Sequence, residues 1–384
     1  MQRFYFDHNA IIPVAPEVVE AMVSCLGQTY GNAFSIHHFG QAAKQKLEAA
    51  RRQVAGLVHC HPAEIVFTSG GTESDNLAIL GVVRAAAHER RHVVTSAIEH
   101  PAVLAACAQL EREGVDVTRL PVGASGIVNP DDLRRALRGD TVLVSVMHAN
   151  NEIGTLQPVA EIARITRTAG VCLHVDGVQA LGKVPVDVEA LGVDLYSMSG
   201  HKICAPKGVG VLFVRKGIRL QPIQFGGHHE RDRRPDTENV AGAVAFGLAA
   251  ELAAGRLAAD ADRLAHLRDR LENGILSGIP GTSVNGSRWH RTPNTTNICF
   301  DGVEGEAMVI ALDLRGFAVS TGSACSSGAV EPSHVLLSLG MPAQQARSSL
   351  RFSLGCGNTL AEVDALIEAV ADSVRHLRRI SVHA

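Results

Sequence analysis

Lys202 is the residue whose chemistry the surrounding sequence singles out. It follows Val193-Asp194-Leu195-Tyr196-Ser197-Met198-Ser199-Gly200-His201, in which an apolar strand gives way to small polar residues. Open α/β sheets bind ligands at the carboxyl ends of parallel strands, and a lysine in a dry pocket there can lose its proton and form a Schiff base with a carbonyl. A solvated surface lysine is the alternative, but Ser199, His201 and an Asp after an earlier strand favour a functional one.

A second candidate is the segment Gly70-Gly71-Thr72-Glu73-Ser74-Asp75-Asn76, which separates an expected strand at 64–69 from an expected helix at 77–87. Free backbone N–H groups and the helix dipole favour a phosphate at such a position. The segment is not a Walker loop, because no Gly-Lys-Ser/Thr follows it. Simple N-capping by Thr72 or Ser69 is the alternative.

Four further polar residues follow expected strands or lie in the loops beyond them. Asp176 could hold the protonated nitrogen of a pyridine ring, and His100 could stack on a flat ring or move protons near pH 7. Asn151 and Gln179 could hydrogen-bond a ring oxygen or a substrate, although each of the four also has a purely structural alternative. With Lys202 and the anion-binding segment, they form the set of groups that pyridoxal phosphate requires.

Cys325 lies in the small, polar, glycine-bounded segment Ser320-Thr321-Gly322-Ser323-Ala324-Cys325-Ser326-Ser327-Gly328. We expect a mobile loop that exposes a thiol able to react as thiolate, with a buried cysteine in a tight turn as the alternative. The chain has no C-x-x-C pair, so neither a zinc ribbon nor a thioredoxin motif is present. Most of the other cysteines are expected to be buried thiols.

The elements that must position these residues alternate between strands and helices from residue 64 to residue 199. This alternation predicts an α/β fold with a mostly parallel sheet covered on both faces. Segment 208–214 is expected to be an antiparallel strand at the sheet edge, and segment 240–276 to be two helical stretches with a break near Asp260. Residues 297–378 are expected to form a smaller α+β unit.

The overall composition is that of an ordinary globular enzyme or binding protein. The chain has 384 residues, of which 46% are hydrophobic and 20% charged, and this length suggests two or three structural units. A net charge of −3 predicts no direct binding to nucleic acid. No long apolar run predicts a membrane span, and the N-terminus lacks a signal-peptide pattern, so we expect a cytoplasmic protein.

The sequence resembles the cysteine desulfurases of the NifS/IscS-like class almost from end to end. The motifs that carry the resemblance are Thr68-Ser69-Gly70-Gly71-Thr72-Glu73-Ser74-Asp75-Asn76, Glu99-His100-Pro101, Met147-His148-Ala149-Asn150-Asn151-Glu152-Ile153-Gly154, His174-Val175-Asp176, Ser199-Gly200-His201-Lys202, Gly322-Ser323-Ala324-Cys325-Ser326-Ser327-Gly328, Glu331-Pro332-Ser333-His334-Val335-Leu336 and Ser349-Leu350-Arg351-Phe352-Ser353.

The resemblance implies a homodimeric enzyme of pyridoxal 5'-phosphate fold type I. Its large cofactor-binding domain would span residues 16–257, and its small domain would comprise residues 1–15 and 258–384. The resemblance implies that Lys202 binds the cofactor covalently, that Asp176 pairs with its ring nitrogen and that Gln179 bonds its ring oxygen. It implies that His100 stacks on the ring and acts as acid and base, and that Asn151 and Arg351 bind the substrate carboxylate. The residues implied to bind the phosphate are Gly71, Thr72, Ser199, His201 and Thr237 of a second subunit.

The implied reaction converts L-cysteine to L-alanine, with the sulfur held as a persulfide on Cys325. The sulfur would pass to an acceptor protein such as an iron–sulfur scaffold or a thiolation enzyme. The chain departs from the family pattern at Ile11-Ile12, Cys204-Ala205, Arg234-Pro235-Asp236-Thr237 and Cys356-Gly357-Asn358. These departures leave open a selenocysteine lyase, an aminotransferase-like activity, and a specialised or non-catalytic paralogue that acts as a binding subunit.

Overall fold

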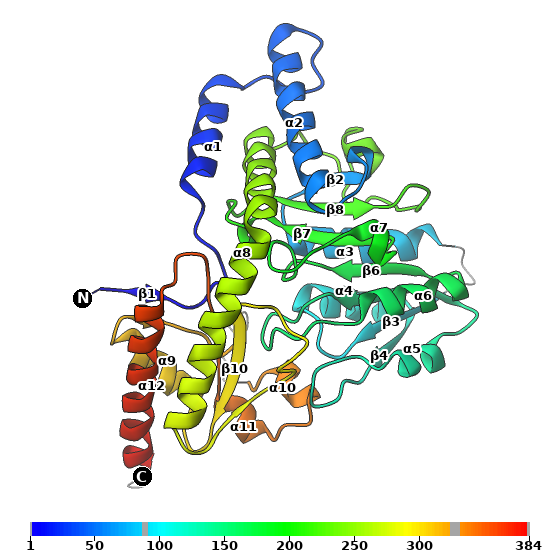
Figure 1. Ribbon diagram of the computed structural model, residues 1–384. Helices are drawn as coiled ribbons and strands as arrows, with labels where there is room; N and C mark the ends of the chain where they lie inside the picture. Colours follow the sequence, from blue (N-terminus) through cyan, green and yellow to red (C-terminus); the bar gives the residue numbers. More distant parts are fainter. Residues whose placement is uncertain (1, 87–90, 323–330, 382–384) are drawn as a thin grey trace.

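The computed structural model describes residues 2–86, 91–322 and 331–381. Within these ranges the chain forms a large mixed sheet, a smaller antiparallel sheet and a short two-stranded pair (Figure 1). The expected α/β architecture, with a mostly parallel large sheet and a smaller α+β part, is confirmed.

The large sheet has the strand order β2–β8–β7–β6–β5–β3–β4 in the described part of the chain. These strands are β2 (Ile65–Thr68), β3 (His92–Ser96), β4 (Asp116–Leu120), β5 (Thr141–Met147), β6 (Cys172–Asp176), β7 (Leu195–Ser199) and β8 (Gly210–Val214). β8 is antiparallel to β2 and to β7, as expected for its direction. Segment 208–214, which contains β8, was expected at the edge of the sheet, and this prediction is wrong because β2 forms that edge. β8 is apolar and fully buried, as suits an interior strand.

Helices cover both faces of this sheet. α3 (Gly71–Ala85) and α4 (Pro101–Arg112) pack on the face to which Val66 points, whereas α2 (His38–Leu57) and α6 (Val159–Ala169) pack with Phe67 on the other face. Successive strand residues therefore enter opposite cores, as the two-residue period of a strand requires. The remaining helices around the large sheet are α1 (Pro16–Gln28), the 3-10 turn η1 (Pro62–Glu64), α5 (Pro130–Ala136), α7 (Val188–Leu191), η2 (Gly200–Lys202) and η3 (Glu230–Asp232).

The smaller sheet is formed by C-terminal strands in the order β12–β10–β9, all antiparallel. Its strands are β9 (Thr282–Val284), β10 (Thr295–Phe300) and β12 (Ser349–Ser353), and the N-terminal β1 (Phe4–Tyr5) pairs with β11 (Phe317–Ala318). The surrounding helices are α9 (Gly305–Asp313), α10 (His334–Ser338), α11 (Ala343–Arg347) and α12 (Leu360–Ser381). The chain's N-terminus thus lies beside its C-terminal part (Figure 1).

α8 (Val240–Gly278) runs past both sheets as one continuous helix, so the expected break near Asp260 is wrong. Its first half packs in the core around β5–β8 and its second half in the core around β10 and β12. By length and composition alone α8 could cross a membrane, but its burial in both cores is that of a core helix. The expected domain division after residue 257 falls within α8 and stays a prediction.

Candidate active site

The carboxyl ends of β3, β5, β6 and β7 meet at one edge of the large sheet and open into a cavity of about 590 Å³. All predicted site residues except Thr237 and Cys325 line this cavity, namely Gly71, Thr72, His100, Asn151, Asp176, Gln179, Ser199, His201, Lys202 and Arg351. The parallel strand order brings these residues together. Each of them except Arg351 lies at or beyond the carboxyl end of a strand of the large sheet. Arg351 lies on β12 of the smaller sheet. Sequence spacing alone could place Arg351 on a strand but not beside this edge.

Lys202 ends the short turn η2, directly beyond the buried strand β7. Its side chain is half-buried, and its Nζ donates hydrogen bonds to the backbone oxygens of Asn9 and, at 2.7 Å, of Ala10. The residue therefore lies at the cavity wall against the N-terminal segment, and the alternative of a solvated surface lysine does not hold.

The N-terminus of α3, where an anion-binding position is expected, lies at the wall of the cavity. The helix begins at Gly71, six residues earlier than expected, and none of the described side chains caps its first turn. Capping by Thr72 or Ser69 is therefore not observed; the Ser69 N–H instead donates to Glu73 Oε2 at 2.7 Å. A Cβ at position 71 would lie 2.8 Å from Val178 Cγ2, which explains the glycine at this wall of the cavity.

Asp176 is a buried carboxylate at the carboxyl end of β6, with 5% of its surface exposed. Its Oδ1 accepts the Val178 N–H at 3.0 Å, and the following Gly177 packs so closely on Tyr196 that a Cβ there would overlap the ring. Burial raises the pKa of Asp176, while electrostatic interactions with His100 and Lys202 oppose this rise.

Asp75 lies on the buried side of α3 as a second carboxylate beside Asp176, and it was not among the site residues predicted from the sequence. It is 1% exposed, and one of its oxygens lies 3.6 Å from His174 Nε2. Burial and the charge of Asp176 raise the pKa of Asp75 well above its ordinary value. A polar residue on the inward face of an otherwise apolar helix was the signal for it.

His100 caps the N-terminus of α4 and also lines the cavity. Its structural role as a helix cap therefore does not exclude a functional role in the cavity. Its Nδ1 accepts the Ala102 N–H at 3.1 Å. Burial lowers the pKa of His100, partly offset by the charge of Asp176. A neutral ring whose Nδ1 accepts must carry its proton on Nε2, so Nε2–H is the group with which His100 can donate.

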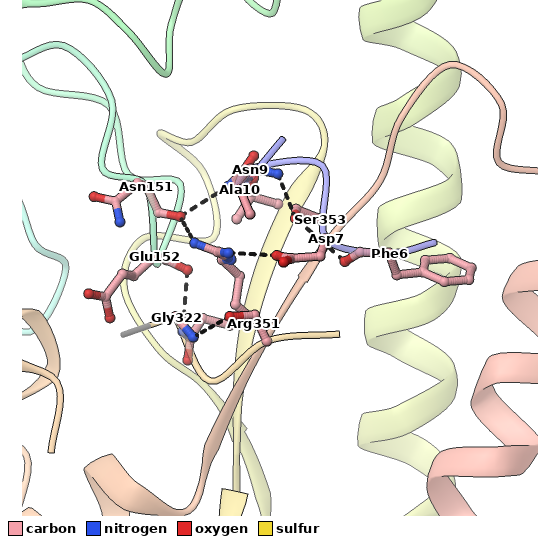
Figure 2. A network of polar contacts seen from close by, with 12 residues as sticks. Phe6, Asp7, Asn9, Ala10, Asn151, Glu152, Gly322, Arg351 and Ser353 are labelled. Atoms are coloured by element: carbon pink, nitrogen blue, oxygen red, sulfur yellow. Dashed lines mark hydrogen bonds and ion pairs between the residues drawn. The ribbon is translucent and has the colours of Figure 1, made fainter. Parts of the chain in front are cut away.

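Arg351 extends from β12 toward the same cavity, with 3% of its surface exposed (Figure 2). Its Nη1 donates to the backbone oxygen of Asn151 at 2.9 Å, and its Nη2 contacts Asp7 Oδ1 at 2.6 Å. Among the described residues, its buried Nε has no hydrogen-bond partner. A guanidinium held in this way can bind a carboxylate that enters the cavity.

Sequence reasoning missed Asn9, which lines the cavity, and the buried Lys183, which hydrogen-bonds to it. Lys183 is buried, and its Nζ donates to Asn9 Oδ1 at 3.0 Å and to Gln179 Oε1 at 2.5 Å. Gln179 Nε2 in turn donates to the backbone oxygen of Asn9 at 2.8 Å, and Lys202 Nζ donates to this same backbone oxygen. Burial lowers the pKa of Lys183 well below its ordinary value. This network fixes the amide of Gln179 and the segment against which Lys202 rests.

Substituting Lys183 by Met is expected to lower the free energy of unfolding by about 2 kcal/mol, because the buried Gln179 Oε1 loses its donor and Asn9 Oδ1 keeps only the hydrogen bond from Asn294 Nδ2. The measurement is urea unfolding of the purified protein, with the exposed Lys216→Met as the matched control. Equal stability of the two variants would show that the Lys183 hydrogen bonds do not hold this network together.

Thr237 and Cys325 are the two predicted residues not found at the cavity. Thr237 lines a separate cavity of about 190 Å³ beside Glu230 and Arg234, and Arg234 forms an ion pair with Glu73 at 2.8 Å. The expected role of Thr237 concerns a second subunit, so it stays a prediction. Cys325 lies outside the described residues, but Gly322, three positions before it, lines the active-site cavity.

The cavity residues fit pyridoxal 5'-phosphate. They comprise an amine at Lys202, a buried carboxylate at Asp176, an imidazole at His100 and an uncapped helix N-terminus beside Thr72. The buried Arg351 Nε offers a further donor for an anionic ligand. Each group has the chemistry that one part of the cofactor or its substrate requires.

This fold and site define a class of enzymes, the class-V aminotransferases, which depend on pyridoxal phosphate. The family model described as "Aminotransferase class-V" matches residues 4–366. The chain is 47% identical over 377 residues to "Cysteine desulfurase IscS" of Methanosarcina thermophila, covering 98% of this chain and 93% of the relative. The chain belongs to the cysteine desulfurase family.

Two solved structures support the same assignment. A "NIFS-LIKE PROTEIN" superposes with a TM-score of 0.92 at 35% identity, covering 98% of this chain and 100% of the other. The structure "SspA in complex with cysteine" superposes with a TM-score of 0.81 at 33% identity, covering 91% of this chain and 98% of the other. The expected pyridoxal phosphate fold type I is confirmed.

Proposed function

We propose that this enzyme is a desulfurase that converts L-cysteine to L-alanine and takes up the sulfur on Cys325. The observation that carries the proposal is the single cavity lined by Lys202, Asp176, His100 and Arg351. Its wall includes Gly322, and three extended residues can reach about 10 Å, so the chain leading to Cys325 starts at the cavity itself. The relative whose structure contains cysteine supports the substrate.

The substrate carboxylate binds at Arg351, whose guanidinium is already oriented by Asp7 and the Asn151 backbone. Its buried Nε and the Asn151 side chain supply hydrogen bonds to the carboxylate. Since Arg351 comes from β12 and Lys202 follows β7, the substrate lies between the smaller and the large sheet.

Pyridoxal phosphate, when bound, supplies an electron sink for charge that develops on the substrate. Asp176 would stabilise the protonated ring nitrogen, Gln179 would bond the ring oxygen, and His100 would pack against the ring. The backbone of Gly71 and the side chains of Thr72, Ser199 and His201 would hold its phosphate. Ser199 Oγ lies 2.9 Å from His201 Nδ1, and burial lowers the pKa of His201 to about 4, so this ring is a neutral hydrogen-bonding group at pH 7.

Lys202 would hold the cofactor covalently and would move protons at the substrate Cα, with the His100 Nε2–H as a second proton donor. The Cys325 thiolate attacks the substrate sulfur, so that an S–S bond forms and the Cβ–S bond breaks. The electron pair of that bond passes to the carbon skeleton, which gains protons to give alanine. The balance is L-cysteine plus the Cys325 thiol to L-alanine plus the Cys325 persulfide.

Replacing Asp176 by Asn is expected to lower kcat/KM for cysteine on the order of 100-fold, because a neutral amide stabilises a protonated ring nitrogen less than a carboxylate does. Steady-state assays of both proteins measure this loss, with the exposed Asp313→Asn as the matched control. If the variant retains cofactor and full kcat/KM, Asp176 does not serve the ring.

The homodimer, the acceptor and the cytoplasmic location are part of the same proposal. The names of the relatives imply transfer of sulfur to an acceptor, and an iron–sulfur scaffold or a thiolation enzyme fits that chemistry. Thr237 would bind the phosphate of the neighbouring subunit in a dimer.

The proposal is tested by incubating the enzyme with cysteine under reductant and measuring alanine and sulfide together. Equal amounts of both support the desulfurase. Amino-group transfer to a keto acid would favour an aminotransferase, and turnover of selenocysteine alone would favour a lyase. A colourless protein that binds no cofactor would favour a non-catalytic subunit.

A further inference from the structure

Glu152 is a buried carboxylate at the active site that has no part in the chemistry proposed above. It lies in the turn beyond β5, directly after Asn151, and 3% of its surface is exposed. Its backbone is fixed on both sides, since its N–H donates to Asn150 Oδ1 at 2.8 Å and its oxygen accepts from Asn297 Nδ2 at 3.2 Å. Its side chain therefore starts from a defined position next to a residue that lines the cavity.

One carboxylate oxygen of Glu152 meets both described residues that flank the segment with Cys325. Ser333 Oγ donates to Glu152 Oε2 at 2.5 Å. A Cβ at Gly322 would lie 3.0 Å from the same oxygen, and the φ of Gly322 is +94°, so a larger residue does not suit this position. Residues 323–332, ten in all, separate Gly322 from Ser333, and Cys325 is one of them. Glu152 thus joins two positions that are distant along the chain.

The Gly322 end is tied to the strand that carries Arg351. The Arg351 N–H donates to the Ser320 oxygen at 2.7 Å, and the Gly322 N–H donates to Ser320 Oγ at 3.0 Å. Gly322 also lines the active-site cavity. Because the chain from Gly322 to Cys325 can span at most about 10 Å, the position of Gly322 limits where the thiol can lie.

The Ser333 end is tied to the residue before His100. Ser333 caps α10, since its Oγ accepts the Leu336 N–H at 3.2 Å. His334 Nε2 lies 3.0 Å from the backbone oxygen of Glu99 and donates to it, because a carbonyl can only accept. This second end is therefore fixed next to a residue that lines the cavity.

The contact between Glu152 and Ser333 is favoured by burial of the carboxyl group. Burial raises the pKa of Glu152, and the hydrogen bond from Ser333 is the largest effect that opposes this rise, followed by electrostatic interactions with His334 and Arg351. A carboxylate removed from water is stable only where such donors replace the water. The hydroxyl of Ser333 therefore has reason to stay on Oε2.

We propose that Glu152 is a positioning residue for sulfur transfer, which holds Gly322 and Ser333 together at the edge of the cavity and so keeps the Cys325 thiol within reach of the substrate sulfur. This role rests on the proposed uptake of sulfur by Cys325. Holding the two ends together excludes the conformations in which they separate, which raises the effective concentration of the thiol at the cavity. Glu152 itself exchanges no proton or electron with the substrate.

The test compares the initial rates of two reactions of the cofactor-loaded enzyme. Alanine formation from L-cysteine needs the Cys325 thiol. Conversion of β-chloro-L-alanine to pyruvate, ammonium and chloride needs the same cavity but no thiol, because chloride leaves Cβ without attack on it. Glu152→Ala should lower kcat for alanine formation on the order of 10- to 100-fold, while KM for cysteine and the rate of chloride release change less than about threefold.

Three further variants separate this role from a general structural one. Ser333→Ala removes the donor to Glu152 and should show the same selective loss, whereas Ser333→Thr keeps a hydroxyl and should retain the wild-type ratio of the two rates. The exposed Glu368→Ala on α12 is the matched control and should leave both rates unchanged.

A single turnover without reductant gives a readout that does not depend on steady-state activity. Mass spectrometry of the Cys325 peptide should show slower persulfide formation in Glu152→Ala, although cysteine still changes the visible absorption as in the wild type. Equal losses in both reactions, or wild-type alanine formation in Glu152→Ala and Ser333→Ala, would overturn the role of Glu152. A wild-type enzyme that forms neither alanine nor persulfide would instead overturn the proposed function, before any variant is compared.

Discussion

Replacing Lys202 by alanine is expected to remove the visible absorption of the purified enzyme after gel filtration and to lower kcat/KM for cysteine by roughly 10³-fold or more. The reason is that the variant lacks the amine that we propose to bind the cofactor covalently and to move the proton at Cα. The Nζ of Lys202 lies at the cavity wall, where the Asn9 and Ala10 oxygens orient it.

The matched control for this substitution is the exposed Lys44→Ala on α2, which should keep both colour and activity. Circular dichroism checks that the Lys202 variant is folded. A folded Lys202→Ala protein that turns over cysteine at the wild-type rate would remove this residue from the mechanism.

Replacing Cys325 by serine should reduce sulfide release from cysteine to background while leaving the visible absorption of the cofactor unchanged. The hydroxyl is a poor nucleophile toward sulfur at neutral pH, so the Cβ–S bond is not broken although cofactor and substrate still bind. Sulfide assays and absorption spectra of the same preparation separate the two effects.

Cys60→Ser is the control for the Cys325 substitution, because Cys60 is a half-buried thiol that does not line the cavity. Undiminished sulfide release by Cys325→Ser would contradict the persulfide step but leave the cofactor assignment in place. Loss of colour in that variant would instead indicate a structural role for the thiol.

The sheet and its strand-end residues could be predicted because their signals are local. An apolar strand followed by small polar residues identified both Asp176 and Lys202, and the rule that parallel strands bind ligands at their carboxyl ends placed them together. Gly71 and Thr72 followed from the glycine turn before α3, although α3 begins earlier than expected because Gly71 already has helical geometry.

The residues that were missed act through contacts distant in sequence. Asn9 reaches Lys183, Gln179 and Thr295, the last at 2.9 Å, only because the N-terminal segment crosses between the two sheets. No periodicity in the first ten residues indicates this position.

Two errors in the fold also have physical causes. Asp260 suggested a break in α8, but it lies 3.7 Å from Arg263 one turn later, a pair that stabilises an exposed helical face. The strand at 208–214 looked like an edge partner of β7, yet β2 pairs with its other side over residues Ile65–Thr68. Strand pairing of this kind is not encoded in the order of elements along the chain.

The measurement that tests the central claim most directly is a visible absorption spectrum of the wild-type enzyme before and after addition of L-cysteine, with alanine quantified in the same sample. The account predicts a visible band in the purified protein, a change of that band on mixing, and alanine accumulation under reductant. A purified enzyme without visible absorption after incubation with pyridoxal phosphate, or a band that cysteine leaves unchanged, would contradict it.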